Sequence, residues 1–566
     1  MWHVERFGAS FAALCPAPAT QRCRPIEKLS MPSLKTEFLI LGSGFGGSLL
    51  ALILARAGRS VAMVDRSQHP RFAIGESSTP LADRTLAQIA DRYGLPALRP
   101  LCHWGSWKRE TPQLLCGKKR GFTYFNQTNG GDLTAENIDA RRLLVAASVD
   151  DDHSDTHWLR SDVDQFVFQL AKDSGVLAFE QCRYTLSQQD AQWILKGSAA
   201  GNVHPSLRRR ELASDHQSIN IKASFLIDAT GSSNGVLQFL NVADHTHLLK
   251  TNSRSIFAHF ESTSSCEQLM RSHSINVDQF PYRCDDAAVH QVLPDGWMWQ
   301  LRFDDDSLSA GFMIDERASG RCVATTFVNS TDEWNWRIAR TPFLSRQFGN
   351  ARIIRPATGL QSTKRIQRLA GQGAGYNWAA IANTVGFIDP LHSTGIAHTL
   401  FSVSRLAALL LETNVVDREQ RLRDYSTWLI EEIRCVDELV EGCYEAIPSF
   451  RLWCLWGMLY FAAVTSMEQT VKVGGSDRAS RRSVMSTEIG GISFLRANDP
   501  AFREVLREAR RRLGIARHAD IKDKISGVSD FETWLKSAVA PWNHVGLFDD
   551  SCNNLYSRTA APADAW

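Results

Sequence analysis

The sequence has almost no excess of either charge, since its 566 residues include 63 basic and 61 acidic side chains, a formal net charge of +2. Proteins dedicated to nucleic-acid binding usually show a basic excess, so no nucleic-acid partner is expected. The twelve cysteines include no pair with CxxC spacing, so neither a zinc ribbon nor a thioredoxin-type motif is expected, and no metal site is predicted. Scattered thiols in a chain of this size favour a reducing, cytoplasmic location over a disulfide scaffold.

Long apolar runs are also missing. No stretch reaches the roughly 18 to 20 apolar residues that cross a bilayer, so no membrane span is expected and residues 452–465 (LWCLWGMLYFAAVT) are predicted to form a buried helix. The first 30 residues contain no clean signal-peptide core. We expect residues 1–34 to be an N-terminal extension, either disordered or a mis-called start. Tryptophan is plentiful, 16 against 9 tyrosines, which predicts flat apolar surfaces in the core or in a pocket.

A β-α-β unit stands near the beginning of the chain. Residues 38–42 (FLILG) and 59–65 (RSVAMVD) are short apolar runs typical of buried strands, and the segment between them has the composition of an apolar helix. Glycines fill the G-x-G-x-x-G positions after the first strand, and Asp65 ends the second strand, close to where an acid meets a ribose hydroxyl. The sequence therefore predicts dinucleotide binding by Asp65 and by the turn residues Gly42, Ser43, Gly44, Phe45, Gly46 and Gly47.

A second dinucleotide-binding motif is missing. Residues 371–375 (GQGAG) are the only contender, but Tyr376 stands where the last glycine belongs and no strand is evident before them, so we predict a loop. One dinucleotide site therefore serves the whole chain, without a nicotinamide domain of its own.

Two later segments have a related pattern. Residues 224–231 (SFLIDATG) predict a strand with a polar, glycine-bearing end, which contributes Asp228 and Gly231. Asn383 begins a loop that leads to a predicted helix over residues 396–411. Together with the first motif, these segments are typical of FAD-binding folds in which distant parts of the chain converge on one flavin.

The predicted fold class is α/β, a Rossmann-like FAD-binding domain with an interleaved antiparallel sheet and a helical C-terminal region. Alternating runs such as residues 297–303 predict the sheet within residues of about 250–370. We expect residues 35–415 to form one FAD and substrate module, and residues 416–566 to form a helical cover on its substrate side.

Five motifs then occur in the order found in one enzyme family. The chain resembles a flavin-dependent halogenase of the tryptophan-halogenase superfamily, which is built on the aromatic-hydroxylase type of FAD fold. The motifs are GSGFGG at 42–47, GESSTP at 75–80, KRGFTY at 119–124, WMW at 297–299 and FIDPLHSTG at 387–395. The last is the most specific, because it matches the F-x-x-P-x-x-S-x-G pattern typical of halogenases.

The resemblance implies roles for particular residues. The backbone amides of Thr394 and Gly395, at a helix N-terminus that favours anions, would hold a halide. Lys119 would be the buried lysine that intercepts or hydrogen-bonds hypohalous acid, although a solvated basic cluster and a role for Lys118 stay open. Trp297 and Trp299 would wall off the flavin from the substrate. Further flavin contacts are expected from Glu76, Ser77, Arg160 and Ile396.

The sequence also departs from the family pattern. The Ile-Pro pair that follows the two tryptophans in the family is replaced by Leu301-Arg302. His392 stands where tryptophan-specific enzymes carry a glutamate, so free tryptophan is disfavoured and His392 is a candidate catalytic residue in proton transfer. Asn383 replaces an aspartate of the aromatic hydroxylases and should still contact the flavin.

The resemblance implies a two-component enzyme. It would use FADH2 from a separate NADH-dependent flavin reductase, oxidise chloride or bromide with O2 to hypohalous acid, and halogenate an electron-rich aromatic substrate, either free or tethered to a carrier. The alternatives are an FAD-dependent hydroxylase, favoured by the lost Ile-Pro pair, a flavin-dependent reductase of a lipid-like substrate, and a flavin-binding protein without catalysis.

Overall fold

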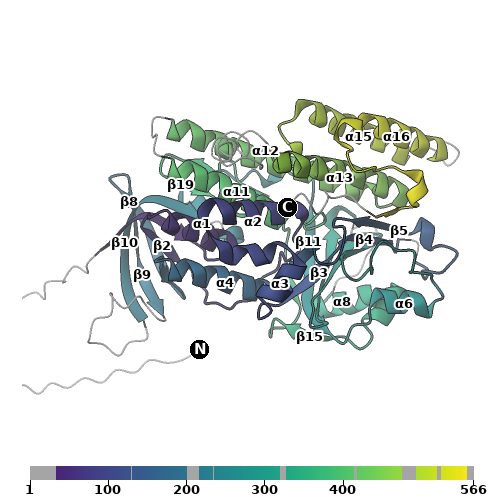
Figure 1. Cartoon of the computed structure of the whole chain (residues 1–566), viewed down its shortest axis with the longest axis horizontal. Helices are drawn as coiled ribbons and strands as arrows, with labels where there is room; N and C mark the ends of the chain where they lie inside the picture. Colours follow the sequence, from purple (N-terminus) through teal and green to yellow (C-terminus); the bar gives the residue numbers. More distant parts are fainter. Residues whose placement is uncertain are drawn as a thin grey trace, which may run out of the picture.

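A computed structural model describes residues 33–557, except residues 129, 201–215, 234, 319–326, 413–416, 474–492 and 519–523. Most of the predicted N-terminal extension therefore lies outside the described residues. Figure 1 shows the described part as two large β-sheets side by side, with the C-terminal helices lying across one side of both.

The first large sheet has a parallel centre. Strand β1 (Leu34–Leu41) lies between β10 (His216–Asp228) and β2 (Val61–Val64), and β2 pairs in turn with β7 (Leu177–Phe179). The end of β1 is fully buried, as expected of a parallel strand that is covered on both faces. Helix α1 (Phe45–Arg56) connects β1 to β2, so the predicted β-α-β unit is confirmed.

Other segments extend this sheet beyond β10. Strand β19 (Trp378–Ala380) pairs with β10 in parallel, and β9 (Gln192–Ala200) pairs with it in antiparallel orientation and carries β8 (Arg183–Gln189). Residues 374 and 375, which were predicted to lie in a loop, form the short edge strand β18 (Ala374–Gly375) against β19. Helix α4 (Arg160–Asp173) packs against α1.

The second large sheet contains the predicted antiparallel strands. Strands β12 (Ala288–Leu293), β13 (Gly296–Arg302), β14 (Leu308–Asp315) and β11 (Ser253–Glu261) are successive antiparallel neighbours. Their apolar side chains form a second buried cluster with those of the short helices α6 (Cys266–Ser272), α8 (Ser330–Ala339) and α9 (Pro342–Gln347). These helices cover the outer face of the sheet, at the lower right of Figure 1.

The second sheet also contains strands from outside the predicted range of about 250–370. Strand β4 (Gly121–Asn126) pairs in parallel with β12, and β5 (Arg142–Ala146) follows it. The edge beyond β5 is formed by β21 (Leu555–Tyr556), near the end of the described chain. At the opposite edge, β11 pairs with β15 (Arg352–Arg355) and β16 (Gln361–Ser362).

Five helices of 15 or more residues are present in the described part of the chain. Helix α11 contacts α1 and α2, while α12 packs on α13 and α15 packs on α16. The C-terminal helices form the upper layer in Figure 1, and the predicted helical C-terminal region is confirmed. Their bounds are α11 (Thr394–Leu411), α12 (Arg418–Ala446), α13 (Phe450–Val473), α15 (Pro500–His518) and α16 (Lys524–Ala538).

Two of these helices are long and apolar enough to cross a membrane by length and composition alone. They are Thr394–Leu411 and Phe450–Thr470, and 83% and 94% of their apolar windows are buried inside the protein. The predicted buried helix over residues 452–465 is thus the middle of the longer helix α13.

Short elements complete the fold. Strands β3 (Cys116–Lys119) and β6 (Asp155–Trp158) form a separate antiparallel pair. The remaining short elements are α2 (Pro80–Tyr93), α3 (Trp104–Glu110), α5 (Gly235–Phe239), α6 (Cys266–Ser272), α8 (Ser330–Ala339), α9 (Pro342–Gln347), β17 (Arg368–Leu369), α10 (Ala382–Val385) and β20 (Gly386–Phe387).

Candidate active site

The glycine-rich turn after β1 packs tightly against the end of β10. Gly42 has a φ of +100°, and a Cβ on it would lie 2.3 Å from the carbonyl oxygen of Ala229. A Cβ on Gly47 would lie 2.2 Å from the carbonyl oxygen of Gly42, so both positions require glycine. Helix α1 starts at Phe45 without a side-chain cap, which leaves its first amides available to an anion.

Two guanidinium groups flank the space above Gly44. A Cβ on Gly44 would lie 3.7 Å from Arg71 Nη2 and 3.9 Å from Arg160 Nη2, both at ordinary contact distance. Arg160 is fixed by Asp164, which accepts from its Nε and Nη2 at 2.8 and 3.0 Å. The Nε of Arg71 is buried without a partner. Two cations beside a helix N-terminus fit the pyrophosphate of a dinucleotide.

Asp65 has a different environment from the one expected of a ribose ligand. Its Oδ2 accepts from the Ser43 amide and hydroxyl, both at 2.8 Å, and its Oδ1 accepts from the Ser67 amide at 2.8 Å. Burial alone would raise the pKa of Asp65, but Arg71 and these donors outweigh it and lower the pKa below its ordinary value. In this structure Asp65 therefore stabilises the conformation of the glycine-rich turn.

The end of β10 meets the segment around Asn383. Asp228 accepts from the Thr230 amide and hydroxyl at 2.9 and 2.7 Å, while its Oδ2 has no partner and burial raises its pKa to about 6. The Gly231 amide donates to the Thr384 hydroxyl at 3.0 Å, and a Cβ on Gly231 would lie 3.4 Å from Asn383 Nδ2. The structure thus brings together three residues that the sequence assigned to the flavin.

Residues 75–80, called the strap, run between the Rossmann-like part of the chain and the second sheet. The Trp158 amide donates to the Glu76 carbonyl at 2.6 Å, so the strap pairs with β6. The Ser393 hydroxyl donates to the Ser77 hydroxyl at 2.9 Å and ties the strap to the turn before α11. The Glu76 carboxylate lies 3.0 Å from His259 Nε2 on β11. The strap therefore connects the Rossmann-like half with the second sheet.

Lys119 ends β3 and is fully buried, with 0% exposure. Its Nζ donates to the carbonyl of Ser78 in the strap, lies 3.7 Å from Asp155 Oδ2 and stands 4.2 Å from the centre of the Phe122 ring. Burial lowers its pKa despite the neighbouring carboxylates. Lys118 points the other way, as alternate residues of a strand do, and pairs with Asp151 at 2.6 Å.

Three buried carboxyl groups surround Lys119. Asp155 is on β6, Asp83 is on α2 and accepts from the Ser78 hydroxyl at 2.5 Å, and Glu468 is on α13. Burial raises the pKa of Asp155 to about 6 and that of Glu468 to about 8, and it raises the pKa of Asp83 as well. Arg84 donates to the Glu468 carbonyl at 2.5 Å. The site around Lys119 can therefore hold and exchange protons near neutral pH.

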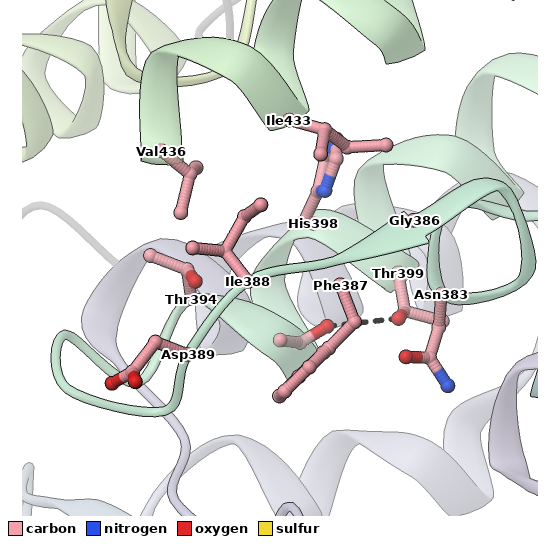
Figure 2. Close-up of a pocket in the computed structure, with 11 residues that line it drawn as sticks. Asn383, Gly386, Phe387, Ile388, Asp389, Thr394, His398, Thr399, Ile433 and Val436 are labelled. Carbon is pink, nitrogen blue, oxygen red and sulfur yellow. Dashed lines mark hydrogen bonds between the residues drawn. The ribbon is translucent and has the colours of Figure 1, made fainter. Parts of the chain in front are cut away.

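Residues 387–395, called the halide loop, lead into α11. Ser393 has a φ of 52°, and no side chain caps the helix, so the first amides of Thr394 and Gly395 are left for another acceptor. A small pocket of about 30 Å³ opens beside them, lined by the loop, by α11 and by α12. Figure 2 shows Thr394 and Asp389 at one end of this pocket and Asn383 at the other. Its size suits a monovalent ion or one to two waters.

His392 belongs to the halide loop, and the two tryptophans of β13 lie near it, since Tyr444 bonds both Trp297 and Asp389 of the loop. His392 stacks on Tyr460, with ring centres 4.2 Å apart, and the Tyr460 hydroxyl donates to its carbonyl at 2.8 Å. Burial lowers the pKa of His392 to about 3, so the imidazole is neutral at physiological pH. Trp297 and Trp299 are buried neighbours on β13, and Trp297 Nε1 donates to the Tyr444 hydroxyl at 3.1 Å.

No model of a known protein family matches the chain. Tetracycline 7-halogenase of Kitasatospora aureofaciens is 25% identical over 428 residues, which cover 74% of this chain and 71% of that enzyme. Monodechloroaminopyrrolnitrin halogenase PrnC of Pseudomonas fluorescens is 24% identical over 486 residues, which cover 82% and 76%. The chain is a homologue of the flavin-dependent halogenases. The recognition made from the five sequence motifs is confirmed.

Solved structures show the same fold for this halogenase homologue. A mutant of halogenase PltM in complex with FAD superposes with a TM-score of 0.76 and 21% identity, over 93% of this chain and 99% of the other. The flavin-dependent brominase Bmp2 superposes with a TM-score of 0.56 and 18% identity, over 84% and 100%. The predicted fold class is confirmed. Hydroxylase or reductase chemistry is not favoured by these relatives.

Several residues of the halogenase homologue were missed by sequence reasoning. Asp83, Asp155 and Glu468 come from three elements that are far apart in the chain, and nothing local marks them as neighbours of Lys119. Tyr444 is one of several aromatic residues in the C-terminal helices, and nothing local marks it as a neighbour of Trp297 and Asp389. Arg368, which donates to Asn383 Oδ1 at 3.2 Å, carried no signal at all.

Proposed function

We propose that this chain is a two-component halogenase that uses FADH2, O2 and chloride or bromide to halogenate an electron-rich aromatic substrate. The observation that carries the proposal is the strap, because it joins the halide loop at Ser393 to the buried Lys119 through Ser77 and Ser78. The halogenase relatives support the same reaction class. A separate NADH-dependent flavin reductase is the proposed source of reduced flavin.

The flavin would lie along the glycine-rich turn, with its pyrophosphate near Arg71 and Arg160 and its ring system toward Asp228 and Asn383. Reduced flavin, when bound, supplies the two electrons that activate O2 for halide oxidation. Thr394 and Gly395 hold the halide by their backbone amides at the N-terminus of α11. Glu76, Ser77 and Ile396 line the path beside the ring system.

Lys119 then directs the hypohalous acid. Its ammonium donates a hydrogen bond to the oxygen of that acid, which makes the halogen more electrophilic toward an aromatic carbon. Lys119 gives a proton to that oxygen, which leaves as water, and the proton that the ring carbon loses passes to the Asp155 carboxylate, so the atoms and charges balance. Asp155 returns a proton to Lys119 across 3.7 Å. Neutral His392 and the wall of Trp297 and Trp299 keep the oxidant on this path.

The test combines the purified protein with FAD, a flavin reductase, NADH, O2 and bromide, and follows electron-rich phenols, indoles and pyrroles by mass spectrometry. We expect a halide-dependent mass shift. Lys119→Ala should keep FAD binding and release peroxide, but should lose at least 100-fold in halogenated product, the scale of a lost general acid. Lys118→Ala, which removes the ion pairs with Asp151 and Asp286 and the contact with the Trp104 ring, should halogenate like the wild type.

Two outcomes contradict the proposal. Oxygen insertion without halide dependence would identify a hydroxylase. Full halogenation by Lys119→Ala would remove the lysine from the reaction even if the halogenase activity itself is found. The cytoplasmic location and the choice between a free and a carrier-tethered substrate stay predictions.

A further inference from the structure

Asp389 is a buried carboxyl group in the halide loop that the proposed reaction does not use. Its Oδ2 accepts from the Tyr444 hydroxyl at 2.9 Å and from the Ser253 hydroxyl at 3.2 Å, and its Oδ1 accepts from the Leu391 amide at 3.0 Å. These three donors are neutral, and the carboxyl group forms no ion pair among the described residues. Asp389 is 2% exposed, so bulk solvent screens its charge poorly.

The same residue lines the pocket at the N-terminus of α11. Asp389, Thr394 and Gly395 all border this pocket of about 30 Å³, and Figure 2 shows Asp389 and Thr394 at the same end of it. A halide held by the amides of Thr394 and Gly395 would therefore lie in a small pocket that the buried residue Asp389 also lines. A carboxylate would repel that halide, whereas a neutral carboxylic acid would not.

The surroundings of Asp389 favour its neutral form. Burial raises its pKa to about 7, and the carboxylate of Asp315 on β14 acts in the same direction, although the Tyr444, Leu391 and Ser253 donors oppose both. Trp297 on β13 reaches it only through Tyr444, and Cys443 is the other titratable group on α12 that faces it.

The other charged groups at this pocket are already compensated. His398 lines the pocket and its Nε2 lies 2.9 Å from Glu432 Oε2. Glu432 is also paired with Arg405 at 2.7 Å, and these partners overcome its burial and lower its pKa to about 2. Glu432 therefore stays ionised across neutral pH. Asp389, which lines the pocket, is the acid whose protonation changes in that range.

We propose that Asp389 couples halide binding to proton uptake, so that the halide loop binds chloride or bromide tightly only when Asp389 is protonated. This inference rests on the proposed function, because it concerns the same halide. Linkage makes the coupling reciprocal: a bound halide favours the protonated acid, and a proton on Asp389 favours the halide. Halide affinity therefore falls as the pH rises through the pKa of Asp389.

The test measures halide affinity and not turnover. Protein loaded with oxidised FAD is titrated with potassium bromide at constant ionic strength, and the dissociation constant is read from the flavin difference spectrum between pH 6 and 8.5. We expect the wild-type constant to rise about fivefold or more over this range, which is within the usual span of such couplings. Asp389→Asn, which keeps the size but not the charge, should vary by less than twofold.

Two further variants sharpen the test. Tyr444→Phe removes a donor that stabilises the carboxylate, so the midpoint of the pH dependence should move to higher pH. Glu441→Gln is the matched control: the pKa of Glu441 is raised by burial to about 7, but this residue pairs with Arg510 at 2.7 Å and does not line the halide pocket. It should keep the wild-type pH dependence.

The outcomes separate this inference from the proposed function. An equal pH dependence in the wild type and in Asp389→Asn would overturn the coupling, and a halide-dependent product in the same preparations would leave the halogenase proposal standing. The absence of saturable bromide binding at every pH, together with the absence of a halogenated product, would overturn both.

Discussion

The glycine-rich turn allows a paired test of fold and cofactor binding. The two variants are Gly47→Ala and Gly44→Ala. A Cβ on Gly47 would lie 2.2 Å from the backbone oxygen of Gly42 and 2.9 Å from Ala229 Cβ, so β1, α1 and the end of β10 would have to separate. Overpacking of this kind costs about 1–3 kcal/mol or more of unfolding free energy. A Cβ on Gly44 meets nothing closer than 3.7 Å and leaves the packing intact.

The two variants should therefore differ in kind. The unfolding free energy of Gly44→Ala should lie within about 0.5 kcal/mol of the wild-type value. Its methyl group, however, occupies the space between Arg71 and Arg160 where the pyrophosphate is expected. Losing one hydrogen bond to a charged group costs about 1.5–3 kcal/mol, which is about a 10- to 150-fold rise in the dissociation constant for FAD. Urea unfolding without FAD and fluorescence titration with FAD measure the two effects. Equal stability of Gly47→Ala and the wild type would refute this reading, as would normal FAD binding by Gly44→Ala.

Two more predictions concern pH. Burial raises the pKa of Glu468 to about 8, so the folded protein keeps a proton that the unfolded chain releases near its ordinary pKa. The unfolding free energy should therefore fall as the pH rises from about 5 to 8, by at most about 1.4 kcal/mol per pH unit for this group. In Glu468→Gln the urea midpoint should fall less steeply with pH. An unchanged slope would contradict this prediction. His392→Phe keeps a ring against Tyr460 and should lower the halogenation rate equally at every pH from 6 to 9, because the imidazole does not titrate there. A changed pH profile would show that His392 does titrate during the reaction.

Features with a local cause could be predicted from the sequence. The β-α-β unit was predictable because its apolar runs and its glycines lie within 30 residues of each other. The opposite directions of Lys118 and Lys119 follow from the alternation of a strand, once β3 is known to be one. The halide loop was recognised because its motif is contiguous and runs directly into α11.

Features with a long-range cause could not be predicted in this way. The carboxyl groups around Lys119 come from α2, β6 and α13, whose contact depends on the whole packing. The internal hydrogen bonds of Asp65 depend on the conformation of the glycine-rich turn, so its position at a strand end did not reveal them. The extent of the second sheet was also missed, because β21 and β4 join it from opposite ends of the chain.

The strand order has a consequence for how this chain is made. Strand β1 cannot pair with β10 until residue 221 has been synthesised, because Leu34 pairs with Ile221. Strand β5 gains its outer neighbour only when Leu555 pairs with Leu144. Such high contact order slows folding and prolongs the exposure of unpaired strand edges. The first sheet is complete once β19, which ends at Ala380, has left the ribosome, whereas the second sheet also needs β21 near the end of the described chain. Fragments that end before α13 would lack Glu468, and C-terminal truncations or fusions near residue 555 should reduce the soluble yield more than changes elsewhere on the surface.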